Sequence, residues 1–183
     1  MSAPAAAFML FDTAVGACAL VWGEHGLIGV LLPEADAPAT RAKARRRYPG
    51  ARDDTAPPPA VQRVAERIRA LLDGGRDDLE DIELDLRAIG PFERRVYAVA
   101  RAIHPGHTRS YGEVATALGD PLLARAVGQA LGANPFPIIV PCHRVLAAGS
   151  KSGGFSAPGG TRTKLRLLEI ERAPLGGTPG LFD

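Results

Sequence analysis

Cysteine is scarce in this sequence. Cys18 and Cys142 are the only two among 183 residues, too few for a disulfide framework, and neither has the CxxC or Cys/His spacing of a structural metal site. Disulfide-rich secreted domains and zinc fingers are therefore excluded. Two reduced thiols suit a cytoplasmic protein, and no residue pattern indicates a metal or another cofactor.

Long hydrophobic runs are also missing. No apolar stretch is long enough to cross a bilayer. The first 16 residues begin with small side chains but lack a basic region, and Asp12 interrupts their apolar run. We therefore expect neither a signal peptide nor contact with a membrane.

Net charge is low, at +2, but it is unevenly distributed. Residues 88–172 hold eleven lysines and arginines against five aspartates and glutamates, whereas residues 1–87 hold eleven against fourteen. A basic half beside an acidic half suggests that the C-terminal half meets a polyanion. On its own, this asymmetry does not identify a nucleic acid.

Hydrophobic patterning predicts a small α/β unit in the first half. Residues 8–33 alternate apolar runs with Gly and Asp breaks, which is typical of two or three antiparallel strands joined by tight turns. Residues 36–48 are helix-prone, and residues 59–72 carry the apolar stripe of an amphipathic helix. Alternating Ile and Leu in residues 81–90 predict one more strand.

The pattern becomes helical after Gly90 and Pro91, so a domain boundary is expected there. Residues 92–103 have one apolar face. We expect an N-terminal α/β domain at 1–88, a second domain at 89–172 and a mobile tail at 173–183.

Two short helices follow in the second domain. Ser110 and Glu113 have the spacing of a capping box for a helix over 111–118. Asp120, followed by Pro121, is expected to cap the next helix, over 122–131. Two such helices joined by a tight turn are typical of a helix-turn-helix, although many such corners bind nothing.

A proline-framed segment, residues 134–145, leads to Cys142. Its three prolines each remove a backbone donor and fix φ, so the segment is predicted to be rigid, buried and extended. Arg144 and His143 beside the thiol would lower its pKa. Glu171 faces inward on a predicted helix over 161–172, where it would complete a Cys–His–Glu relay. The alternatives are a buried inert thiol beside a surface histidine, and a helix-end carboxylate that reaches water.

Residues 141–145 (PCHRV) resemble the active-site motif of the O6-alkylguanine-DNA alkyltransferases. Further segments resemble the family in the same order and spacing, namely 108–118, 124–129, 132–145 and the ending from Lys164 to Glu171. The resemblance covers residues 82–172 and is loose before them.

The resemblance implies an α/β (α+β) fold, with an RNase H-like N-terminal domain before a winged helix-turn-helix-like domain. It also implies a suicide DNA repair reaction. A guanine alkylated at O6 would be flipped out of double-stranded DNA, and its alkyl group would pass irreversibly to Cys142. O4-alkylthymine is a second substrate that the residues leave undecided. The protein would act as a monomer without a cofactor.

The family's catalytic roles carry over to four residues. Cys142 would be the acceptor thiolate, and His143 would be its general base through a water. Glu171 would orient His143. Asn134 would tie the helix-turn-helix to the active-site segment, although a helix C-cap is the alternative for this residue.

The family's substrate contacts carry over to five positions. Tyr111 would donate to the guanine edge and crowd the 3′ phosphate, unless it is only a half-buried aromatic at a helix start. The carbonyl of Val145 would accept from the guanine amino group, the Ser156 amide would donate to O6, and Pro137 would wall the pocket. Phe155 stands where many members have tyrosine, which puts the substrate range in doubt.

The DNA contacts centre on the predicted helix 122–131. Arg125 would enter the base stack in place of the guanine, whereas a solvated helix arginine is its ordinary alternative. Small side chains would let this helix approach a minor groove closely, at Ala124, Ala126, Gly128 and Gly132. A glycine inside a helix costs about 1 kcal/mol, so Gly128 is expected to have a reason.

Two other interpretations compete. A papain-like hydrolase also needs Cys and His, but neighbouring side chains on an extended chain point to opposite faces, and the remaining histidines, at 25, 104 and 107, lie in no recognisable signature. A non-catalytic alkyl-lesion sensor or a winged-helix DNA-binding regulator is the more serious alternative. Sensor relatives lack the acceptor cysteine, which this chain has at position 142.

Overall fold

Three antiparallel strands open the chain, as predicted. They are β1 (Ala7–Thr13), β2 (Gly16–Gly23) and β3 (Gly26–Leu31) in the computed structural model, which describes residues 6–147 and 160–174. Gly16 and Gly26 have φ values of +124° and +123°, which let the two connecting turns close tightly. A short strand, β4 (Arg52–Asp53), pairs in parallel with β1, so the sheet order is β3-β2-β1-β4.

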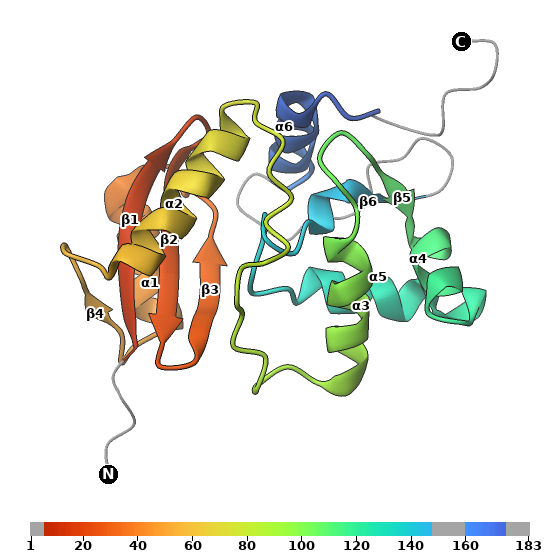
Figure 1. Ribbon diagram of the computed structural model, residues 1–183, viewed down its shortest axis with the longest axis horizontal. Coiled ribbons are helices and arrows are strands. Elements are labelled where there is room, and N and C mark those ends of the chain that lie inside the picture. Colours follow the sequence, from red (N-terminus) through yellow and green to blue (C-terminus); the bar gives the residue numbers. More distant parts are fainter. Residues whose placement is uncertain (1–5, 148–159, 175–183) are drawn as a thin grey trace.

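Helices cover both faces of this sheet (Figure 1). They are α1 (Ala37–Arg47), which Asp36 caps, and α2 (Pro59–Leu72). Successive side chains of a strand point to opposite faces, and β2 uses this alternation on two apolar clusters. Cys18 and Leu20 pack in the cluster that contains α2, whereas Ala19 and Val21 pack with α1. The α/β fold class and both helices are therefore confirmed.

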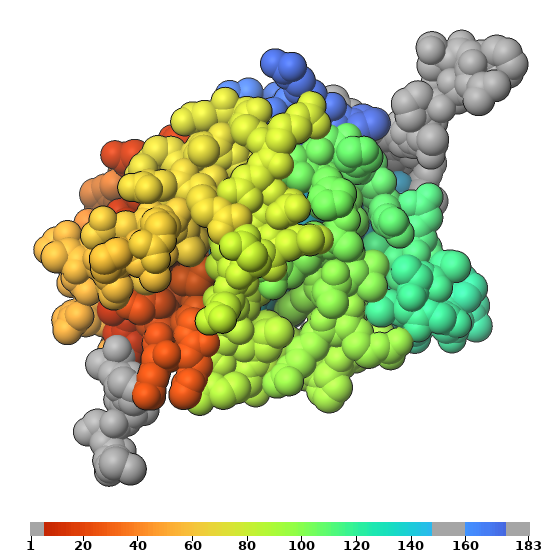
Figure 2. Space-filling model, viewed as in Figure 1, coloured from red at the N-terminus to blue at the C-terminus, as the bar shows by residue number. Residues whose placement is uncertain are grey.

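The strand predicted within residues 81–90 is wrong. Only Leu84 bridges to the sheet, opposite Leu27. Leu79 has a left-handed backbone, with φ of +58°, and Arg101 donates to the carbonyls of Leu79 and Ile82. Those carbonyls therefore bond to a side chain and not to a neighbouring strand. The segment 73–90 instead runs along the seam between the two halves of the molecule (Figure 2).

Helices dominate the second half, as predicted. They are α3 (Pro91–Arg101), α4 (Tyr111–Ala117), the 3₁₀ helix η1 (Pro121–Leu123), α5 (Ala124–Gly132) and α6 (Thr161–Glu171). Both hydrogen bonds of the capping box between Ser110 and Glu113 are present. Asp120 caps η1 by accepting from Leu122, so α5 begins two residues later than predicted.

The segment before Cys142 turns where an extended chain was predicted. The Val140 amide donates to the Phe136 carbonyl at 2.8 Å, and Ile138 has φ of +76°. The 3₁₀ helix η2 (Cys142–Arg144) follows, then β6 (Val145–Leu146), which pairs in parallel with β5 (Arg109–Ser110). Prolines leave this chain without the donors of a strand, so it closes on itself in short turns.

The two halves share one apolar core. A single cluster of buried side chains includes Phe11 and Leu27 from the first half and Val96, Val114 and Leu167 from the second. No helix in the described part of the chain is long and apolar enough to cross a membrane.

Candidate active site

Cys142 begins the 3₁₀ helix η2 and is buried, with 7% of its surface exposed. Its amide donates to the Val140 carbonyl at 2.8 Å. Asn134 braces the same turn from the end of α5, since its side-chain amide donates to the Val140 carbonyl at 2.9 Å and its oxygen accepts from the Phe136 amide at 2.8 Å. The thiol thus lies on a turn that is hydrogen-bonded at several points.

A buried ionic network lies next to Cys142. His143 Nε2 is 2.8 Å from Glu171 Oε1, and both side chains are buried. Arg144 donates to both carboxylate oxygens of Glu171, at 2.7 and 2.9 Å, and to the Ile103 carbonyl at 2.6 Å. The inward position predicted for Glu171 is where the structure places it, and its carboxylate does not reach water freely.

The network fixes the protonation of both partners. Burial raises the pKa of Glu171, but His143 and Arg144 outweigh it and hold that pKa at about 2. Burial lowers the pKa of His143 even though Glu171 opposes the shift, so the imidazole is neutral at pH 7. A neutral ring that faces a carboxylate through Nε2 carries its proton there. Nδ1 is therefore the basic nitrogen, and it has no hydrogen-bond partner among the residues that the structure describes.

The thiol itself departs from expectation. Burial raises the pKa of Cys142, while Asn134 and Lys164 lower it less strongly. The prediction that Arg144 and His143 depress this pKa is wrong, because the guanidinium of Arg144 is taken up by Glu171 and the imidazole is neutral. In the resting protein the thiol keeps its proton, so a base must remove it.

Lys164 belongs to the site and was given no role from the sequence. It is fully buried on α6, donates to the Val145 carbonyl at 2.6 Å, and lies 5.7 Å from the centre of the Tyr111 ring. Burial lowers its pKa to about 8 although Cys142 opposes the shift. The signal was present, since Lys164 stands three residues before Leu167, on the inward stripe of α6.

The remaining predicted residues fall into three groups. Val145 is buried, while Tyr111 and Pro137 are partly buried. Arg125 is exposed on α5, and Gly128 lies against Tyr111, where an added Cβ would be 3.7 Å from the ring. Ala124 and Ala126 are partly exposed beside them, and Gly132 is exposed where α5 ends. Phe155 and Ser156 lie outside the described residues.

The arrangement can perform nucleophilic chemistry at one sulfur. Cys142 could supply the nucleophile, and His143, which Glu171 holds in place, could act as its base. Within residues 6–147 and 160–174, no three His, Cys, Asp or Glu side chains are grouped to hold a metal ion. The helical pair α4–η1–α5 lies on the same half of the molecule as this site (Figure 1).

Comparison with known proteins gives consistent matches. Residues 91–173 match the family described as 6-O-methylguanine DNA methyltransferase, DNA binding domain. A methylated-DNA–protein-cysteine methyltransferase of Methanothermobacter thermautotrophicus is 35% identical over 158 residues, which cover 86% of this chain and 81% of that protein. One of Mycolicibacterium paratuberculosis is 44% identical over 126 residues, which cover 69% and 74%. The crystal structure of Mycobacterium tuberculosis OGT in complex with DNA aligns with a TM-score of 0.71 at 35% identity and covers 91% of this chain and 94% of that one.

Proposed function

Because the chain belongs to the methylated-DNA–protein-cysteine methyltransferases, we propose that Cys142 takes the alkyl group from O6-alkylguanine in double-stranded DNA and keeps it. One observation carries this proposal. The buried thiol of Cys142 directly precedes a neutral imidazole whose Nε2 is bound to Glu171 and whose Nδ1 remains basic. That is the arrangement of a thiol with its own base.

The reaction balances without a cofactor. Nδ1 of His143 takes the thiol proton, through a water in the manner of the family. The sulfur of Cys142 attacks the alkyl carbon, the carbon–O6 bond breaks as the sulfur–carbon bond forms, and guanine leaves as an anion that regains the proton. The product is a thioether that the site has no means to hydrolyse. One protein molecule therefore repairs one lesion.

The base must leave the duplex to reach Cys142. Unstacking costs a few kcal/mol, and a side chain that enters the gap offsets part of it. Arg125 is exposed on α5 and has the length for this role. Tyr111, at the start of α4, would crowd the phosphate beside the lesion, while Ala124, Ala126, Gly128 and Gly132 let α5 approach the minor groove.

Contacts to the flipped base follow the same proposal. Val145, Pro137 and Tyr111 would line the base pocket, the Ser156 amide would donate to O6, and Phe155 would replace the tyrosine of many relatives. Asn134 would hold the turn that carries the thiol. The described groups around the thiol, from Asn134 to Glu171, all come from one chain, which supports action as a monomer. We further propose that the protein acts in the bacterial cytoplasm. The proposed division is an N-terminal domain at 1–88, a DNA-binding and active-site domain at 89–172 and a tail at 173–183.

Intact mass spectrometry tests the assignment of the acceptor. After incubation with duplex DNA that contains O6-methylguanine, the protein should gain one methyl group, and peptide mapping should place it on Cys142. Cys142→Ala should gain none while still binding the DNA. Cys18→Ala is the matched control and should be methylated normally, because burial raises the pKa of the Cys18 thiol to about 12 and leaves it inert. A lesion sensor or regulator would gain no mass, and a hydrolase would turn over without lasting modification.

A further inference from the structure

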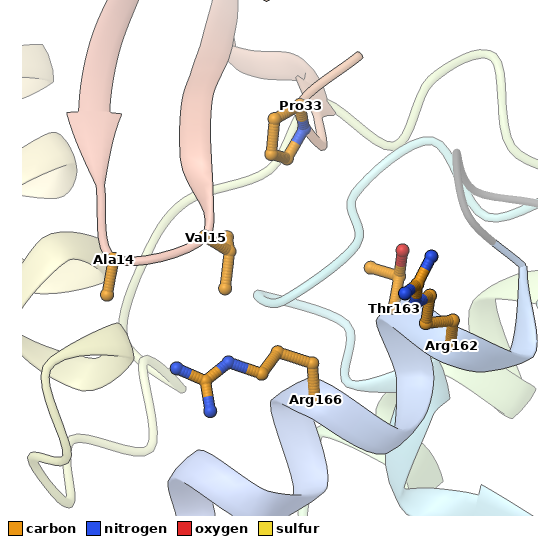
Figure 3. A pocket seen from close by; sticks show the side chains of 6 residues that line it. All are labelled: Ala14, Val15, Pro33, Arg162, Thr163 and Arg166. Atoms are coloured by element: carbon orange, nitrogen blue, oxygen red, sulfur yellow. The ribbon is translucent and has the colours of Figure 1, made fainter. Parts of the chain in front are cut away.

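A separate cavity of about 350 Å³ lies on the far side of α6 from the active-site network. Helical periodicity places Lys164 and Glu171 on the inward face of α6, and Arg162 and Arg166 on the opposite face. This second face looks toward the turn between β1 and β2 (Figure 3). The cavity is lined by Ala14, Val15, Pro33, Arg162, Thr163 and Arg166.

The cavity holds two positive charges with little to balance them. Arg162 and Arg166 are four residues apart on one helix face, where like charges repel each other and destabilise the helix. Arg162 forms no ion pair with any residue that the structure describes. Arg166 is 3.6 Å from Glu169, beyond hydrogen-bond distance, and both side chains are more than half exposed.

Among the described residues, the opposite wall offers no carboxylate. It is made by Ala14, Val15 and Pro33, which are apolar. Figure 3 shows Arg166 extending from α6 toward Ala14 and Val15, while Arg162 lies beside Thr163 and points away from Arg166. An anion between the two arginines would relieve their repulsion, and an apolar group attached to it would contact the opposite wall.

From these observations we propose that the Arg162–Arg166 cavity binds a phosphate group. A planar guanidinium presents paired donors that match phosphate oxygens, and two of them balance the charge of a dianion. The volume lies within the roughly 300–1,000 Å³ that is usual for small-molecule sites. The phosphate could belong to a free phosphate monoester or to the DNA backbone. The cavity does not depend on the chemistry at Cys142.

Inorganic phosphate tests the site directly on the intact protein. Thermal unfolding is followed while phosphate replaces chloride at constant ionic strength. The wild-type Tm should rise and saturate, since a ligand that binds only the folded state stabilises it. Arg162→Gln/Arg166→Gln should bind phosphate at least about tenfold more weakly, because each missing charged hydrogen bond is large on this scale. Arg45→Gln/Arg46→Gln, which removes equal charge from α1, should respond as wild type does.

A DNA-binding measurement distinguishes a phosphate of the DNA backbone from a free phosphate monoester. If the phosphate belongs to DNA, Arg162→Gln/Arg166→Gln should weaken duplex binding and lower the slope of log affinity against log salt by about 1 for each DNA phosphate that is no longer neutralised, while Arg45→Gln/Arg46→Gln should not. If it belongs to a free monoester, duplex binding is unchanged while phosphate affinity still falls.

Two results would overturn the proposal. One is a rise in Tm that never saturates. The other is an equal response in all three proteins, which would mean an adventitious ion only. Methyl transfer to Cys142 is measured separately in each variant, so a failure of the proposed reaction is not confused with a failure of this site.

Discussion

Glu171 is the residue on which the active-site network converges. Its carboxylate accepts from His143 and from two nitrogens of Arg144, and all three side chains are buried. Because these partners hold the pKa of Glu171 below its ordinary value, the ionised carboxylate stabilises the folded state. Because its pKa is lower in the folded state than in the unfolded state, that stability is present above pH 4.5 and is lost as the pH falls toward 2.

Acid unfolding should therefore be steep and should depend on this carboxylate. His143 adds to the effect in the same direction, because burial lowers its pKa below 6.5, so its contribution is lost as the pH falls below that value. Urea unfolding of the wild type should show decreasing stability below about pH 6.5 and a further decrease below about pH 4.5.

Glu171→Gln provides the comparison. It leaves Arg144 buried without its counter-charge, so the free energy of unfolding at pH 7 should fall by about 3–5 kcal/mol. Its stability should also fall less steeply below pH 4.5 than that of the wild type. If the free energy of unfolding of Glu171→Gln decreases below pH 4.5 as steeply as that of the wild type, another carboxylate controls acid unfolding.

Residues such as these show what a sequence can and cannot reveal. The motif around Cys142 and the inward position of Glu171 were readable from resemblance and spacing. The direction in which the pKa of Cys142 shifts was not readable, because it depends on the burial of the thiol and on the pairing of Arg144 with Glu171. Lys164 was missed because a lysine on an inward helix stripe gains meaning only when its acceptor, the Val145 carbonyl, is known.

Among the elements, α5 combines a packing surface with an exposed one. Val127, Ala130 and Leu131 are buried, while Arg125 is exposed. Gly128 lies between these surfaces. Its missing side chain is not required by packing, because an added Cβ would lie 3.7 and 3.8 Å from the Tyr111 ring, which is ordinary contact distance.

Gly128→Ala should consequently separate stability from DNA binding. Alanine is favoured over glycine in a helix interior, so the free energy of unfolding should rise by about 1 kcal/mol. The new methyl group would stand on the helix surface that we propose to approach DNA, so duplex affinity should fall. Reaction with free O6-benzylguanine should be unchanged. Unaltered duplex binding would show that the α5 surface at Gly128 does not approach DNA.

Elements with a local cause were predictable, and those with a distant cause were not. The helix at 59–72 and the hairpins of residues 7–31 follow from periodicity and glycine turns, and the structure has them at these positions. The strand expected within 81–90 reduces to one bridge, between Leu84 and Leu27, and Arg101 of α3 bonds the Ile82 carbonyl just before it. The proline-framed turn before Cys142 depends on Asn134 and on packing that no local pattern contains.

At the scale of the whole molecule, the N-terminal and C-terminal halves pack against each other as a single folded unit. They share a continuous apolar core, and the Val30 amide of β3 donates to the Pro135 carbonyl beside the active-site turn at 2.9 Å. The N-terminal sheet thus braces the segment that carries Cys142.

Unfolding should accordingly occur in a single cooperative step. The chain has one tryptophan, Trp22, which lies in β2 and reports on the first half. Reactivity of Cys142 toward a thiol reagent reports on the second half. Both probes should give the same urea midpoint. Two midpoints would mean that the halves unfold independently.

The account as a whole depends on His143 acting as the base for a thiol that is protonated at rest. The most direct test is the rate of alkyl transfer from free O6-benzylguanine to Cys142 as a function of pH, in the wild type and in His143→Gln. The wild-type rate should be level from about pH 7 upward, since the imidazole is already neutral there. His143→Gln should be slower by about 10²–10⁴-fold at pH 7 and should gain about tenfold per pH unit as hydroxide deprotonates the thiol. A loss of the same size at every pH, or no loss at all, would contradict the account.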